Sequence, residues 1–358
     1  MIACVIPAYR AGATVCAVVS AALRYCDAVV VVDDACPEHS GDLVAAEFGA
    51  NAAVRVVRHE RNGGVGRAMK SGFAECIRIG ASIIVKIDAD GQMDVGYIPR
   101  VVELFEADPD LIYVKGNRFA NTDVLGRMPK LRLFGNAMLS LLVKFSSGYW
   151  NLLDPTNGYI AFNGLALAEM DLEQFADSFF FEISVLCALG LKNARIAELE
   201  MTTIYGDEQS SLSIRKVAWE FPPRLLGRFL RRILLRYFVF DVNLGTLYLV
   251  FGTLLLVGAG GLGVVEWIQS AVTGLPRSTG TVMLVVLPFL IGVQLFLNAL
   301  MYDVQFAPRS DHVFALRRPL VRVRAQARPA AERDWDEPRP IGDSLRRRAD
   351  RHDDARDE

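Results

Sequence analysis

A short apolar segment of this chain ends abruptly at two acidic side chains. Residues 83–87 are rich in Ile and Val, which is typical of a buried strand, and Asp88 and Asp90 follow directly. Side chains two residues apart in extended backbone lean to one side, so these carboxylates repel each other unless a cation lies between them. Carboxylate and amide oxygens suit Mg²⁺ or Mn²⁺, which makes Asp88, Asp90 and Gln92 candidate metal ligands. The alternative is an acidic turn ahead of the next helix.

The first third of the chain alternates between strand and helix patterns. Short, continuously apolar strands separated by helices predict an α/β fold with a mostly parallel sheet and helices on both faces. No dinucleotide-binding fingerprint or P-loop sequence lies at a strand–helix junction. The expected strands are residues 2–6, 28–32, 54–57, 83–87 and 111–114, and the expected helices are 14–25, 41–48 and 64–79.

Polar clusters follow several of these strands. The carboxyl ends of parallel strands meet at one edge of a sheet, which is where such folds bind ligands. Acidic side chains there can accept hydrogen bonds from a base or ribose, and glycines let the backbone approach a ligand closely. Each cluster also has a local alternative as a turn or a helix cap. The clusters begin with Pro7 and Tyr9, Asp33 and Asp34, the glycines from Gly63 to Gly66, and Asp88.

Two uncharged segments in the last third predict membrane spans. Residues 244–265 and 281–302 are each about 22 residues long, enough to cross a hydrocarbon core of roughly 30 Å. The alternative is a pair of buried core helices. Arginines flank both segments, whereas the connector at 266–280 has only Arg277. By the positive-inside rule we expect a two-span protein of the inner or plasma membrane, with the N-terminal domain and the C-terminal tail in the cytoplasm.

Residues 215–240 combine apolar residues at helical spacing with arginines. This pattern predicts an amphipathic helix in the membrane interface, with its arginines on anionic membrane lipid; packing against the soluble domain is a compatible alternative. Beyond residue 324 large apolar residues are scarce and disorder is expected. The chain thus divides into residues 1–213, 214–241, 242–303 and a largely disordered tail at 304–358.

Six cysteines are scattered without a CxxC pair, as in a reducing compartment. The N-terminus has no basic region ahead of its apolar residues, so no signal peptide is expected. The formal net charge is −2, and we expect no nucleic-acid partner.

Five segments in this order, followed by two spans, resemble a known family. The resemblance is to family 2 glycosyltransferases with the Rossmann-like GT-A fold, and within them to dolichyl- and polyprenyl-phosphate sugar synthases. It covers residues 1–303. The segments are Ile6-Pro7-Ala8-Tyr9, Val32-Asp33-Asp34, Asn62-Gly63-Gly64-Val65-Gly66, Asp88-Ala89-Asp90-Gly91-Gln92 and Lys115-Gly116-Asn117-Arg118-Phe119; Arg127-Met128-Pro129 and the stretch from Arg132 to Asn136 also fit.

The resemblance implies metal-dependent, inverting transfer of one sugar from a nucleotide-diphosphate sugar to a polyprenyl phosphate. It assigns donor binding to Pro7, Tyr9, Asp33, Asp34, Gly64 and Asp88. It assigns the metal to Asp88, Asp90 and Gln92, catalysis to Asp88, Asp90, Arg118 and Arg132, and the acceptor phosphate to Arg118, Arg132 and Asn136. Departures such as Arg10-Ala11 and Cys36-Pro37 leave the donor open.

Two other functions remain open from the sequence. The acceptor is a lipid or glycan hydroxyl in the first, which would require a carboxylate base. The second is a non-catalytic membrane scaffold. Association of copies through the transmembrane helices is also open.

Overall fold

The computed structural model describes residues 1–119, 130–201 and 214–313, without the side chains of 130–132 and 214–218. Several sequence predictions therefore lie outside the described residues. These are the segment at 127–129, the side chain of Arg132 and the tail from residue 314 onward.

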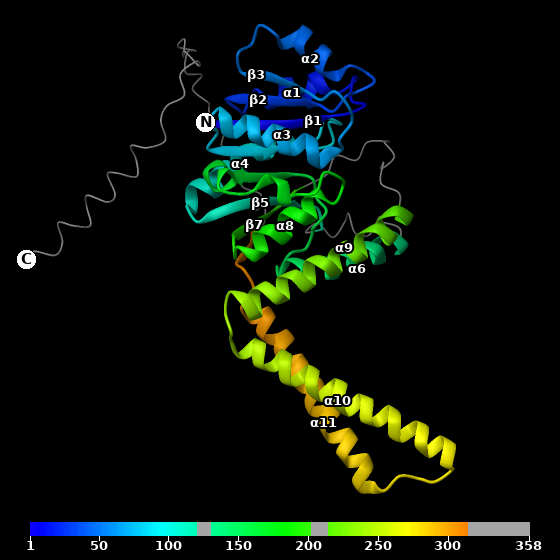
Figure 1. Cartoon of the computed structure of the whole chain (residues 1–358). Helices are drawn as coiled ribbons and strands as arrows, with labels where there is room; N and C mark the ends of the chain where they lie inside the picture. The colour runs from blue at the N-terminus through cyan, green and yellow to red at the C-terminus, as the bar shows by residue number, and fades with distance from the viewer. Residues whose placement is uncertain (120–129, 202–213, 314–358) are drawn as a thin grey trace, which may run out of the picture. The chain divides into compact units, whose positions relative to one another are not determined.

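An eight-stranded sheet forms the centre of the N-terminal domain (Figure 1), in the order β3-β2-β1-β4-β6-β5-β7-β8. Every strand is parallel to the others except β6. The mostly parallel α/β sheet predicted from the sequence is confirmed. Its strands are β1 (Ile2–Ala8), β2 (Ala28–Asp33), β3 (Val54–Arg58), β4 (Ile83–Lys86), β5 (Leu111–Asn117), β6 (Ile160–Asn163), β7 (Arg195–Glu200) and β8 (Ser310–Val313).

Helices cover both faces of this sheet, so the central strands are buried on both sides. In β2 every residue is buried, and alternate side chains enter two separate cores. Val30 and Val32 pack with Phe73 of α3, whereas Val29 and Val31 pack on the side of α1 and α4. The helices are α1 (Val15–Ala22), α2 (Ser40–Phe48), α3 (Val65–Arg78), α4 (Ile98–Ala107) with a preceding 3₁₀ turn (Val95–Tyr97), α7 (Gly164–Ala168) and α8 (Phe181–Leu191).

The chain leaves this domain through helix α9 (Ile214–Leu234), which packs against helix α6 (Lys130–Ser147). A π-helical turn (Leu235–Val239) follows α9 and leads to two long antiparallel helices, α10 (Leu244–Thr273) and α11 (Thr279–Gln305) (Figure 1). They extend beyond the predicted spans, so the connector is only residues 274–278. Glycines permit their close crossing, since a Cβ on Gly292 would lie 3.0 Å from the backbone nitrogen of Leu256.

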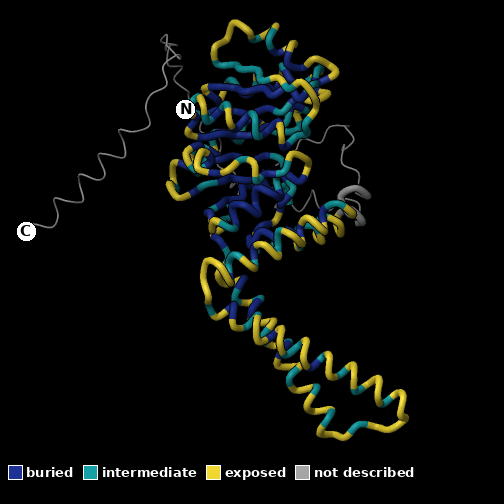
Figure 2. The backbone as a smooth tube through the Cα atoms, viewed as in Figure 1, coloured by how far each residue is buried: buried dark blue, intermediate teal, exposed yellow. Residues whose placement is uncertain are grey.

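Both long helices are apolar enough to cross a membrane, and their side chains are mostly exposed (Figure 2). In the most apolar 18 residues of each helix, only 11% are buried in α10 and 6% in α11. This exposure argues against the alternative of two core helices. These two helices are therefore candidate membrane spans.

Strand β8 lies after α11 yet belongs to the domain sheet, where it pairs in parallel with β7. Its side chains also bind the domain: Arg195 Nη2 is 2.9 Å from Asp311 Oδ2, and His312 Nδ1 is 3.0 Å from Glu198 Oε2. The chain thus returns to the domain after the two long helices. The sequence predicts a largely disordered tail from residue 304 onward. The structure differs from this prediction, because residues 310–313 form an edge strand.

Helix α9 packs against the domain, which is the alternative that the sequence left open for residues 215–240. The helix and the π-helical turn after it also expose an apolar stripe at four-residue intervals. Arg232 departs from the expectation that the arginines face lipid, because it is 1% exposed. The exposed stripe consists of Leu226, Leu230, Leu234 and Phe238.

A buried ion pair joins α9 to α11. The Arg232 guanidinium donates to both oxygens of Asp303, at 2.8 and 2.9 Å, and also to the carbonyl oxygen of Phe145 on α6. Tyr237 and Trp150 donate to the same carboxylate, at 2.6 and 2.9 Å. The pair therefore ties the long helices to the domain through groups from four segments.

Arg232→Ala leaves the Asp303 carboxylate buried without its cation, and we expect it to lower the free energy of unfolding by about 3–5 kcal/mol. The neighbouring Arg231 is exposed, so Arg231→Ala is the matched control and is expected to be nearly neutral. Chemical unfolding of the full chain in detergent measures both. Equal destabilisation by the two variants would contradict the role given to the ion pair.

Candidate functional site

The carboxyl ends of all strands but β6 lie at the same edge of the sheet. The segments that follow β1, β2, β3, β4 and β5 begin there, together with the segment that leads into antiparallel β6. Most of the residues singled out from the sequence belong to these segments. We therefore take this edge as the candidate site.

Asp33, at the end of β2, holds its own loop in place. Its side chain is 7% exposed, and its two oxygens accept hydrogen bonds from the backbone nitrogens of Cys36 and Gly41, both at 2.7 Å. A Cβ on Gly41 would lie 2.6 Å from Asp33 Oδ2, so this approach requires glycine. The local alternative for Asp33, a turn and helix-start residue, describes these contacts well.

Asp34 joins the β2 end to the glycine-rich segment after β3. Its oxygens accept from the backbone nitrogens of Gly63 and Gly64, at 2.9 and 2.8 Å. His59 Nδ1 is 2.7 Å from Asp34 Oδ1, and His59 Nε2 is 2.8 Å from the hydroxyl of Ser71. The carboxylate therefore fixes the shape of this loop.

The glycines at the start of α3 make room for another part of the protein. The nitrogen of Gly66 donates to the carbonyl oxygen of Asp177 at 2.8 Å, and a Cβ on Gly66 would collide with the carbonyl oxygen of Ala176. Gly64 has φ of 92° and also lies against Asp177. The segment ahead of α8 thus closes the amino end of α3, where a helix otherwise presents unpaired N–H groups.

The acid pair after β4 is organised around a buried lysine. Lys86 is 2% exposed, and its Nζ lies 2.8 Å from Asp88 Oδ1 and 3.1 Å from Glu182 Oε1 at the start of α8. Burial alone would lower the pKa of Lys86, but the two carboxylates outweigh it and raise the pKa above the ordinary value. Asp90 accepts from the backbone nitrogen of Gln92 at 2.9 Å.

A second buried lysine lies on the adjacent part of the sheet. Lys115 of β5 is fully buried and donates to the carbonyl oxygen of Asn157. Burial lowers its pKa to about 8, because the carboxylates nearby compensate only in part for lost hydration. The surroundings therefore raise the pKa of Lys86 and lower the pKa of Lys115.

Arg118, just after β5, forms a two-pronged pair with Asp154. Its Nε and Nη2 lie 2.8 and 3.1 Å from the two carboxylate oxygens, and its backbone nitrogen donates to the same group. Asp154 is fully buried, and its backbone nitrogen donates to Glu198 at 3.0 Å. Burial raises the pKa of Glu198. Asp154 thus fixes the plane and position of the guanidinium.

Residues 154–158 connect the acid pair to the arginine. Asp154, at one end of this segment, pairs with Arg118. At the other end a Cβ on Gly158 would lie 2.8 Å from Asp88 Oδ2 and 2.9 Å from Lys86 Nζ, so the backbone there is pressed against the acid. The structure therefore brings the predicted metal ligand Asp88 and the predicted phosphate ligand Arg118 to opposite ends of one short segment.

Asp88, Asp90 and Gln92 supply only hard oxygen ligands, which fits Mg²⁺ or Mn²⁺. Among residues 1–119, 130–201 and 214–313 no three His, Cys, Asp or Glu side chains gather as a metal site. Two carboxylates and an amide therefore fit an open site that shares its ion with phosphate oxygens of a ligand.

The other predicted residues lie as follows. Tyr9 is 44% exposed beyond β1, and the guanidinium of Arg10 lies 5.4 Å from the centre of its ring. Pro7 is partly buried in β1, and Asn136 is partly buried on α6. No comparison tests the roles of individual residues, which stay predictions.

Lys86 is the main site residue that sequence reasoning missed. The sequence signal is a single lysine inside the apolar run at residues 83–87. A lysine is stable in such a buried strand only if carboxylates lie next to it. Glu182 and Asp154 also belong to this site, and no sequence pattern predicts their partners Lys86 and Arg118.

Part of the N-terminal domain is similar to a known protein family. Residues 3–169 match the family described as Glycosyl transferase family 2. This range includes the sheet from β1 to β6 and every predicted site residue.

Two curated relatives are similar to parts of this chain. One is a UDP-N-acetylglucosamine–dolichyl-phosphate N-acetylglucosaminyltransferase of Methanococcus voltae, 33% identical over 153 residues that cover 42% of this chain and 60% of that protein. The other is an undecaprenyl-phosphate mannosyltransferase of Micrococcus luteus, 28% identical over 177 residues, covering 49% of this chain and 71% of that protein.

Among solved structures, a mannosyltransferase from Pyrobaculum calidifontis in complex with GDP-Man and Mn²⁺ is 15% identical and covers 85% of this chain and 87% of that one. Its TM-score of 0.45 is too low to support a conclusion about this chain. The family match over residues 3–169 and the two curated relatives agree with the fold and the motifs described above.

Proposed function

We propose that this protein transfers one sugar from a nucleotide-diphosphate sugar to a polyprenyl phosphate at the cytoplasmic face of a membrane. The observation that carries the proposal is the segment at 154–158, with Asp88 at one end and Arg118 at the other. A donor diphosphate and an acceptor phosphate would then meet on either side of it. The two curated relatives are named for transfers to a dolichyl phosphate and an undecaprenyl phosphate, which supports the same proposal.

The donor would lie over the ends of β1 to β4. Asp33 and Asp34 already accept backbone hydrogen bonds, so their contribution would be to shape the loops that hold the nucleotide. Pro7, Tyr9 and Gly64 border the same edge. The open oxygen site of Asp88, Asp90 and Gln92 would hold a divalent ion, which supplies positive charge to a leaving diphosphate.

Lys86 would keep the Asp88 carboxylate oriented. Because its Nζ is shared with Glu182, rotation of the Asp88 carboxylate away from the site would leave a buried ammonium partly unpaired. Asp88 is therefore held ready before any ligand binds.

A lipid phosphate is ionised at neutral pH and needs no general base. One of its oxygens would form the new bond to the anomeric carbon while the bond to the diphosphate oxygen breaks and the nucleoside diphosphate leaves, with inversion at that carbon. Arginine suits the positioning of such a group, since its planar fork matches phosphate. Arg118, fixed by Asp154, would act with Arg132 and Asn136.

The membrane orientation follows from charge. Arginines precede α10 and follow α11, whereas the short connector has only Arg277. Since β8 returns to the domain sheet, the domain and the residues after α11 share one side, which we assign to the cytoplasm.

The direct test incubates membranes bearing the full chain with radiolabelled nucleotide sugars, polyprenyl phosphate and Mg²⁺. Label is expected in an acid-labile anionic lipid and is expected to be lost with EDTA. Label found only in neutral lipid would point to a hydroxyl acceptor, and no label from any donor would favour a scaffold.

Asp90→Asn tests the acid pair in the same assay. We expect transfer to fall by about 100-fold or more, because a preorganised charge interaction with the leaving group is lost. Asp94→Asn is the matched control, since Asp94 is exposed four residues away and only caps the next turn. If both variants kept full activity, the metal site would be misassigned.

Arg118→Lys tests the acceptor role while keeping the positive charge beside Asp154. We expect the KM for polyprenyl phosphate to rise about tenfold, because lysine cannot reproduce the planar fork. Nucleotide affinity, measured by titration calorimetry, should stay within twofold. An equal loss of both would remove Arg118 from acceptor binding.

A further inference from the structure

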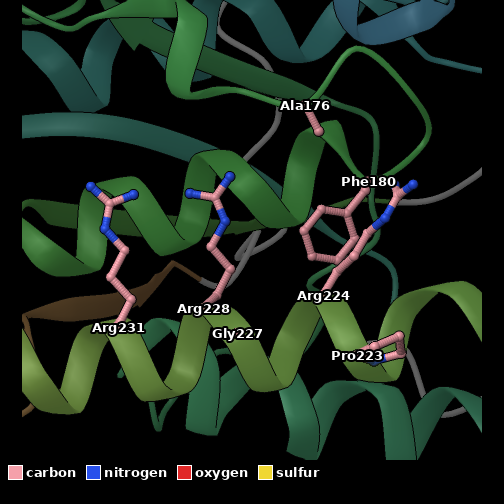
Figure 3. Close-up of a pocket in the computed structure, with 7 residues that line it drawn as sticks. All are labelled: Ala176, Phe180, Pro223, Arg224, Gly227, Arg228 and Arg231. Atoms are coloured by element: carbon pink, nitrogen blue, oxygen red, sulfur yellow. The ribbon is translucent and has the colours of Figure 1, made fainter.

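An arginine-lined groove of about 410 Å³ lies between α9 and the segment ahead of α8 (Figure 3). Arg224, Arg228 and Arg231 project from one face of α9 at helical spacing, and Phe180 faces them. Ala176, Pro223 and Gly227 complete the lining. None of the predicted donor or acceptor residues whose side chains the structure describes is among the residues that line this groove.

Among the residues that the structure describes, no carboxylate neutralises the positive charge of this groove. Arg224 donates to the hydroxyl of Ser178 at 3.2 Å, and Arg228 donates to the carbonyl oxygen of Gln174 at 3.0 Å. Within the described ranges no carboxylate forms an ion pair with Arg224, Arg228 or Arg231. In contrast, Arg232, one helical turn beyond Arg228, is paired with Asp303. Three guanidinium groups around one hollow form a site for a multiply hydrogen-bonded anion, and phosphate is the anion they suit best.

The same helix presents apolar surface beside this charge. Leu226, Leu230 and Leu234 are each more than half exposed, and the helix leads directly into the candidate spans. A ligand that fits both surfaces has a phosphate head and an acyl tail.

We infer that the groove binds the phosphate group of an anionic membrane phospholipid. The alternative source, the acceptor polyprenyl phosphate, fits less well. Its phosphate must reach a sugar held near Asp88 and Asp90, whereas the residues that line the groove include neither these acids nor Arg118.

Binding in the groove also affects the segment that supports the proposed donor site. Ala176 lines the groove, and the carbonyl of Asp177 accepts from the start of α3. Lys70 of α3 lies 2.7 Å from the carboxylate of the same Asp177. A phospholipid held by Arg224 and Arg228 therefore fixes the segment whose other side shapes the glycine-rich loop.

The test measures lipid binding to the delipidated full chain in detergent by native mass spectrometry. Phosphatidylglycerol is expected to bind at least tenfold more tightly than phosphatidylcholine, since each arginine near a lipid phosphate contributes about 1 kcal/mol. The variant R224Q/R228Q/R231Q is expected to lose this preference, and R224K/R228K/R231K to retain part of it. The control R24Q/R100Q/R309Q, with the same net charge, is expected to bind like the unmodified chain.

Three outcomes would overturn the inference. These are equal binding of the two lipids, an equal loss in the control variant, and binding of glycerol 3-phosphate as tight as that of phosphatidylglycerol. If R224Q/R228Q/R231Q lost polyprenyl phosphate binding but bound phosphatidylglycerol unchanged, the inference would also be overturned, because the groove would then belong to the acceptor. Because no sugar is transferred in this assay, its result is independent of the proposed function.

Discussion

The buried ammonium group of Lys86 stands between the carboxylates of Asp88 and Glu182, and the edge of the sheet is organised around that contact. It joins the end of β4 to the first turn of α8, two elements far apart in the sequence. A buried lysine without an acidic partner would be costly, and so would a buried acid without the lysine. Because Lys86, Asp88 and Glu182 compensate one another's charge, the carboxylates of Asp88 and Glu182 keep one arrangement without a bound ligand.

Much of the fold could be predicted because it depends on local pattern. Runs such as residues 28–32 are apolar at every position, which only a strand buried on both faces explains, and β2 has that environment. The order of strands and polar loops then fixes which side chains meet at the carboxyl edge. The contacts themselves could not be predicted. Asp34 binds the backbone of Gly63 and Gly64, and nothing in the sequence distinguishes that from a contact with a nucleotide.

Helix α9 shows a second limit of pattern reasoning. Its periodicity correctly indicates an amphipathic helix, but periodicity cannot say which polar side chains face protein. Arg231 and Arg232 are neighbours in sequence, yet one lines an open groove and the other is buried against Asp303, about seventy residues further along the chain. The burial of an arginine depends on a partner that only the tertiary structure supplies.

Strand β8 has a consequence for the order of assembly. It is made after both apolar helices, so the outer edge of β7 stays unpaired throughout their synthesis. An open strand edge readily pairs with other chains. Completion of the sheet therefore waits until the helical hairpin has been made and has turned back, and correct folding of the hairpin becomes a condition for sealing the domain against aggregation.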